Sequence, residues 1–70
     1  MELKELIDLS NKAFQEKNFE KVIELLEKVI VLQPNRDEIY LRLGLASSSL
    51  GKLEEAIVYF KKGASINSNS

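Results

Sequence analysis

Seventy residues with a net charge of −1 are enough for one small domain, and the content of 30% charged and 44% hydrophobic residues is typical of a folded chain rather than a disordered one. The chain has no Cys and no His, which excludes disulfides, thiol nucleophiles and thiolate or imidazole metal sites. Its 10 basic and 11 acidic side chains nearly balance, so the charge gives no reason to expect nucleic acid or an anionic membrane as partner.

The first half of the chain predicts two amphipathic helices. Apolar residues recur at steps of three and four at Leu3, Leu6, Ile7, Leu9, Ala13 and Phe14. The polar pair Lys17-Asn18 follows, and Asn tolerates the left-handed conformation that ends a helix. A second apolar series predicts a helix from Phe19 to about Leu32, which ends before Pro34 because proline disfavours helical geometry in the residue before it.

The second half predicts another pair of helices. Asn35 or Asp37 is expected to cap the third helix, and Gly51 suits its C-terminal end. The third helix carries Ile39, Tyr40, Leu43, Leu45, Ala46 and Leu50, and the fourth runs from about Leu53 to Ile66. Connections this short require antiparallel neighbours, so the expected fold class is all-α, with two stacked antiparallel helical hairpins.

The two halves repeat each other. A shift of 34 residues aligns the sequence with itself without a gap. The identical pairs are Leu9 with Leu43, Glu20 with Glu54, Ile23 with Ile57, Lys28 with Lys62, and Asn35 with Asn69. We therefore expect a single domain over residues 1–70 that contains one unit at about 3–36 and a second at about 37–70.

These residues resemble the tetratricopeptide repeat family. The second unit supplies the family's spacing with Tyr40, Leu43-Gly44, Gly51, Ala56 and Phe60, and the first supplies it with Leu6, Leu9-Ser10, Val22, Leu26 and Pro34. Small residues are expected where the paired helices approach closely. The chain departs from the pattern at Val22, Val29, Ser47, Gly63 and Ser68, which places the stability of the second unit in doubt.

The resemblance implies a concave surface that binds a protein or peptide. Carried over position by position, the surface would contain Lys4, Ile7, Asn11, Phe14, Gln15, Glu38, Leu41, Arg42, Leu45, Ser48 and Ser49. Its apolar members are either anchors for a partner or core residues, and we expect at least one or two of Ile7, Phe14, Leu41 and Leu45 to be core. Asn11 matches a family submotif that binds a peptide carboxylate, but Ile7 and Arg42 stand where Lys and Asn are needed. Arg42 could still pair with an acidic partner, but the favoured interpretation is a solvated charge on the helix.

An enzyme is not expected. The glutamates Glu20, Glu24, Glu27, Glu54 and Glu55 alternate with lysines and have the pattern of solubilising charges. The Ser47-Ser48-Ser49 run has no His to activate a hydroxyl, and no Gly-rich phosphate loop occurs. No cofactor, metal, nucleic acid or membrane insertion is expected, and cytoplasmic localisation is the default.

The alternative to a binding module is an assembly element. A repeat unit cannot bury its apolar faces alone. The last predicted helix contains four consecutive apolar residues, at 57–60. The first unit has a charged residue, Glu24, at the position that corresponds to Val58. Such a chain would self-associate through its open end or form part of a longer repeat array, and the candidate contact residues are Ile57, Val58, Tyr59 and Ile66.

Overall fold

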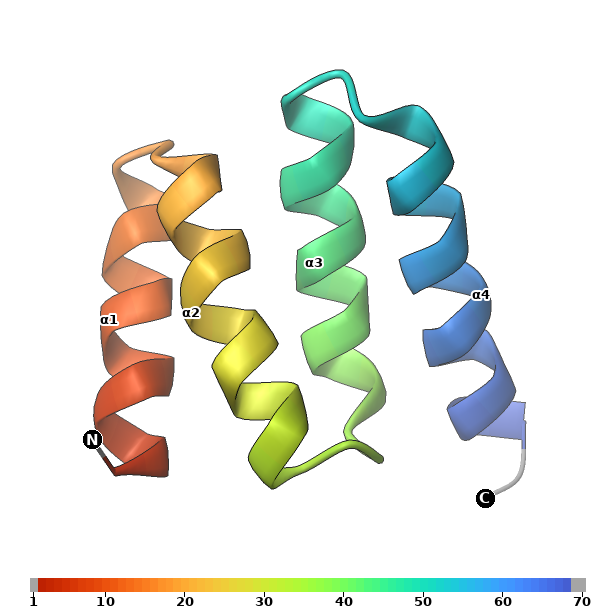
Figure 1. The fold of residues 1–70 in the computed structure, drawn as a ribbon, viewed down its shortest axis with the longest axis horizontal. Helices are drawn as coiled ribbons and strands as arrows, with labels where there is room; N and C mark the ends of the chain where they lie inside the picture. The colour runs from red at the N-terminus through yellow and green to blue at the C-terminus, as the bar shows by residue number, and fades with distance from the viewer. Residues whose placement is uncertain (1, 69–70) are drawn as a thin grey trace.

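Four helices account for most of residues 2–68, the part of the chain that a computed structural model describes. They are α1 (Leu3–Gln15), α2 (Phe19–Leu32), α3 (Asp37–Ser49) and α4 (Leu53–Ser68), which lie side by side in chain order (Figure 1). Each helix contacts the next, so α1–α2 and α3–α4 are antiparallel hairpins and α2 packs against α3. The all-α prediction is confirmed, while the expected match of Asn35 with Asn69 falls outside the described residues.

The core lies where the two hairpins meet. Leu26 and Val29 of α2 and Leu43 of α3 are at most 1% exposed, and Ile39 and Ala46 join the same cluster. These positions follow the three- and four-residue spacing read from the sequence, which places them on one side of each helix. The hydrophobic contact between α2 and α3 therefore holds the two hairpins together.

Both hairpin loops have the same backbone conformation. In the first, the Lys17 amide donates to the Phe14 carbonyl and the Asn18 amide to the Ala13 carbonyl, at 3.0 and 2.8 Å. In the second, the amides of Gly51 and Lys52 repeat this pattern, at 3.0 and 2.9 Å. This pair of hydrogen bonds is the Schellman motif. It requires the left-handed conformation in the first residue after the C-cap of the helix.

The left-handed residue of the first loop is Lys17, with φ of 60°, and that of the second is Gly51, with φ of 79°. Asn18, which we had expected to favour this conformation, is instead the N-cap of α2 and accepts a hydrogen bond from the Lys21 amide. Asn is well suited to this position because its side-chain oxygen satisfies an amide that has no partner within the helix. The Gly51 prediction is confirmed.

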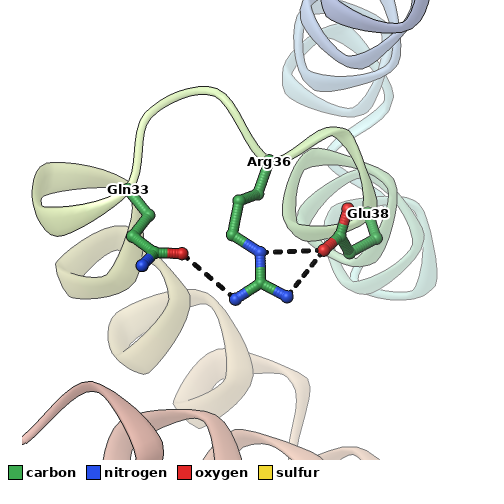
Figure 2. Close-up of polar contacts among 3 residues, drawn as sticks. All are labelled: Gln33, Arg36 and Glu38. Atoms are coloured by element: carbon green, nitrogen blue, oxygen red, sulfur yellow. Dashed lines mark hydrogen bonds and ion pairs between the residues drawn. The ribbon is translucent and has the colours of Figure 1, made fainter.

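The side chain of Arg36 links the end of the first hairpin to the start of the second (Figure 2). Arg36 donates from Nη1 to Gln33 at the end of α2, at 3.1 Å, and from Nε to Glu38 in the first turn of α3, at 2.8 Å. Arg36 is also the N-cap residue of α3 and makes no side-chain cap hydrogen bond, so the expected capping by Asn35 or Asp37 is wrong. The Tyr40 hydroxyl donates to the Pro34 carbonyl at 2.8 Å and fixes the same connection from the α3 side.

Small residues allow α3 and α4 to approach closely. A Cβ atom on Gly44 would lie 2.4 Å from the Phe60 ring, and one on Gly63 would lie 3.3 Å from the Asp37 carbonyl oxygen. Gly63, which the sequence suggests only as a weak point of α4, is buried at this crossing. The absence of a side chain at Gly63 thus leaves room for the close contact between α3 and α4.

Candidate functional site

The predicted concave residues divide into an exposed set and a half-buried set. Ile7 and Phe14 pack against the core, whereas Leu41 and Leu45 are 51% and 42% exposed. Of the four, Ile7 and Phe14 are therefore partly buried against the core, and Leu41 and Leu45 are not. Asn11 and Arg42 are also half-buried, and the exposed members are Lys4, Gln15, Glu38, Leu41, Leu45, Ser48 and Ser49.

Arg42 of α3 is held on α1 by two contacts. One guanidinium nitrogen donates a hydrogen bond to the Asn11 side-chain oxygen. The guanidinium carbon also lies 5.5 Å from the centroid of the Phe14 ring, within the range of a cation–π interaction. The interpretation of Arg42 as a solvated charge is thus wrong, because the residue bridges the first helices of the two hairpins.

The ring of Phe14 also packs against a second aromatic ring. It meets the ring of Phe19 edge to face, with centroids 5.6 Å apart, where α1 turns into α2. The aromatic ring that Arg42 contacts is therefore held in place by Phe19. Asn11 uses one of the five guanidinium donors, and among residues 2–68 no ion pair of Arg42 occurs, so its charge is available to an acidic group.

One of the two exposed leucines, Leu41, lines a pocket. Leu41 and Phe60 are on the wall of this hollow of about 310 Å³ between α3 and α4, and Gly63 and Ala64 also line it. Asp37, Glu38 and Asn67 complete its lining and give one end an acidic character. A backbone hydrogen bond and hydrogen bonding with the side chains of Asp37 and Arg36 lower the pKa of Glu38, so this carboxylate stays charged.

The four candidate self-association residues differ in their exposure. Ile57 and Val58 are 52% and 65% exposed, while Tyr59 and Ile66 are half-buried against the core. Val58 and Tyr59 border a second hollow with Glu27 of α2 and with Glu54 and Glu55. Burial, and then the charges of Glu27 and Glu55, raise the pKa of Tyr59 above its usual value of 10.0.

The five glutamates considered as paired carboxylates are all exposed. Within residues 2–68, no group of three or more metal-ligating side chains of the Cys, His, Asp and Glu types is present. In the same part of the chain, no helix is long and apolar enough to cross a membrane.

Sequence reasoning missed the contact among Asn11, Phe14 and Arg42 because it crosses from one unit to the other. A repeat shift compares equivalent positions, whereas this contact joins positions that are not equivalent. The sequence did contain one indication of this contact. Asn11 and Phe14 are three residues apart, which places both side chains on one face of α1.

Comparison with protein families gives one match. Residues 37–70 match the model of the tetratricopeptide repeat, a segment that contains α3 and α4. Comparisons with curated proteins and with solved structures gave no match. The matched family is a helical protein-interaction repeat and is generally non-catalytic. Residues 37–70, the hairpin of α3 and α4, thus match the tetratricopeptide repeat family, and the whole chain has the all-α architecture of stacked helical hairpins that is typical of such repeats.

Proposed function

We propose that the chain is a non-catalytic module that binds a peptide segment of a protein partner on its concave surface. In this proposal residues 3–36 form a first repeat, and the partner lies across α1 and α3. The observation that carries the proposal is the fixed position of Arg42 beside two exposed leucines. A positioned guanidinium next to exposed apolar side chains offers a partner one charged and two apolar contacts.

The arrangement indicates what the partner should contain. Leu41 and Leu45 are one helical turn apart and would receive two apolar side chains. Arg42 would receive a carboxylate between them, and the cost of ordering its side chain is already met by Asn11 and Phe14. We therefore expect an acidic residue flanked by apolar ones. The exposed polar side chains around this centre, at Lys4, Gln15, Glu38, Ser48 and Ser49, would form a hydrogen-bonding rim.

Selection from a displayed library of random peptides tests the proposal. We expect enriched peptides to carry an Asp or Glu next to apolar residues. The substitution Leu41→Asp should lower the affinity for a selected peptide at least tenfold, because a charge would replace an apolar contact. Leu32→Asp is the matched control, because Leu32 has similar exposure, 56% against 51%, on a different helix, α2.

Arg42 is tested separately on the same selected peptide. Arg42→Ala should weaken binding of this peptide by about the 1.5–3 kcal/mol of a hydrogen bond to a charged group. Arg42→Lys should restore only part of this binding energy, since lysine lacks the planar fork of the guanidinium. The circular dichroism spectrum should keep its helical signal in each variant. Equal binding by wild type, Leu41→Asp and Arg42→Ala would contradict the concave site.

Self-association is the second candidate function, and the exposure of Ile57 and Val58 favours it. Two copies that cover these side chains would sediment as a dimer whose proportion rises with concentration. We expect Val58→Asp to return such a dimer to monomer. A chain that sediments as a monomer at every concentration would exclude this candidate and leave the concave proposal unaffected.

A further inference from the structure

The two hairpins are joined mainly along one pair of helices. The extensive helix contacts are those of α1 with α2, α2 with α3 and α3 with α4, so α1 and α3 are not packed extensively against each other. The crossing angle of two packed helices varies by about 15–20° around its preferred value. Packing of α2 against α3 therefore restricts the angle between the hairpins without fixing it, and this angle sets the separation of α1 and α3 across the concave surface.

Polar side chains hold the junction at the end where α2 passes into α3. Arg36 contacts both helix ends there (Figure 2), and the Tyr40 hydroxyl bonds the same connection. The hairpin loops at 16–18 and 50–52 lie at the other end of the molecule (Figure 1). In the part of the chain that the structure describes, no hydrogen bond or ion pair joins these two loops. A change in the angle between the hairpins would consequently separate the loops most.

One side chain connects α1 with α3 directly. Arg42 of α3 reaches α1, where it donates a hydrogen bond to Asn11 and lies over the ring of Phe14. Both partners are in the second half of α1, away from the connection between α2 and α3. A hydrogen bond from a charged donor is stronger than one between neutral groups, and the guanidinium gains a cation–π contact as well. We call this contact the Arg42 tie and define it by Asn11, Phe14 and Arg42.

The Arg42 tie belongs to this junction and not to the repeat. At the equivalent positions of the other unit, Asp8 corresponds to Arg42, Leu45 to Asn11 and Ser48 to Phe14. A carboxylate there replaces the cation, the leucine cannot accept a hydrogen bond, and the serine has no aromatic face. The contact therefore depends on three particular side chains and does not follow from the helical architecture alone.

We propose that the Arg42 tie fixes the angle between the two hairpins and so holds the concave surface at one width. Without the guanidinium, the hairpins stay joined by α2, α3 and their connection, and the loop end gains freedom to open. A change of about 15° over the 13 residues of α1, about 20 Å in length, moves the end of the helix by about 5 Å.

The consequence of the tie for binding rests on the proposed function. A peptide that contacts α1 and α3 together fits one separation of the two helices best. It therefore binds the tied form more tightly than the open form, and by linkage it narrows the range of angles between the hairpins.

Distances between two spin labels test the tie in the free chain. The chain has no Cys, so Glu16→Cys and Lys52→Cys introduce the only two labelling sites, both exposed and one in each hairpin loop. Electron paramagnetic resonance then gives the distribution of distances between the loops. Glu16→Cys with Glu24→Cys is the control pair, because both of its labels lie in the first hairpin.

We expect Arg42→Ala to widen the distribution of the loop pair and to extend it by up to about 5 Å, while the control pair stays unchanged. Asn11→Ala removes the hydrogen bond and leaves the cation over Phe14, so it should widen the distribution less. Arg42→Lys keeps a cation and a donor and should recover part of the narrow distribution. Lys12→Ala removes an exposed cation of α1 and should have no effect. The circular dichroism spectrum should keep its helical signal in each variant.

The same distribution in wild type and Arg42→Ala would overturn the proposal. Equal widening in the control pair would also overturn it, because the whole chain would then have loosened. A selected acidic peptide should narrow the distribution of the wild-type loop pair, and a peptide that binds without narrowing it would contradict the coupling of binding to the tie. The free-chain distances are measured without any peptide, so a failure of the concave proposal leaves them unaffected.

Discussion

The two hairpins have the same backbone plan and different surroundings. α1–α2 has α3 packed against it, so Leu26 is 1% exposed, whereas the equivalent Phe60 of α3–α4 remains 36% exposed. The difference teaches that the burial of a repeat position depends on the neighbouring hairpin as well as on the residue. Apolar side chains on α4 are therefore available for binding, while their counterparts on α2 stabilise the fold.

The largest expected effect comes from truncating these two equivalent side chains. Leu26→Ala should lower the free energy of unfolding by about 3 kcal/mol, because it leaves a cavity in the core. Phe60→Ala should cost about 1 kcal/mol, since part of the ring is already in water. Urea denaturation measures both values, and Leu26→Val serves if the alanine variant does not fold. Equal costs at the two positions would contradict the difference in coverage.

The second prediction exchanges the left-handed loop residues. Lys17→Gly should stabilise the chain by about 0.5–1 kcal/mol, because glycine adopts positive φ without the steric cost of a Cβ atom. Gly51→Lys should destabilise it by about 1 kcal/mol through the backbone alone, since a Cβ at Gly51 would meet nothing within 4 Å. Thermal unfolding followed by circular dichroism reports both changes. The same sign for the two substitutions would show that the loops are not equivalent.

The third prediction concerns Ser47 of the second hairpin, a buried hydroxyl without a hydrogen-bond partner among residues 2–68. Ser47 is 0% exposed, and its Oγ has no hydrogen-bond partner among residues 2–68, while the equivalent residue of α1 is Ala13. Ser47→Ala should raise the free energy of unfolding by about 1 kcal/mol. Ser10→Ala is the control: this buried hydroxyl donates to the Ile7 carbonyl at 2.7 Å, so its loss should give no such gain. A loss of stability in Ser47→Ala would indicate an unseen partner.

The smallest effect is expected at Tyr59, which stands where the first hairpin has the buried Leu25. Burial and two glutamates hold the pKa of Tyr59 above 10.0, so the neutral phenol is favoured in the folded chain. Its contribution to stability is complete below the unfolded pKa and is lost as the pH rises through the higher folded value.

Absorbance titration in a Tyr40→Phe background follows the ionisation of Tyr59 alone, since the chain has two tyrosines. We expect Glu27→Gln to lower this pKa, because it removes one of the two negative charges that raise it. Lys28→Gln on the same helix is the control, since Lys28 is not among the groups that shift Tyr59. An unchanged titration in Glu27→Gln would contradict a contribution of Glu27 and leave burial and Glu55 as the causes of the raised pKa.

The sequence alone determined the helices, their antiparallel pairing and the resemblance to tetratricopeptide repeats. The spacing of apolar residues, Pro34 and Gly51 are local signals, and the 34-residue shift identified equivalent positions, so these features could be predicted before any contact was known. The residues of the core could be predicted for the same reason, because a buried stripe leaves a regular pattern.

Tertiary structure decided which of the equivalent positions are covered. The left-handed Lys17, the contact of Arg42 with Asn11 and Phe14, and the exposure of Leu41 and Phe60 depend on how the hairpins meet. A repeat pattern cannot encode these features, because it treats both units alike while only one of them has the other packed against its outer side. The physical reason is that burial is a property of neighbours in space, whereas the sequence pattern records only neighbours along a helix.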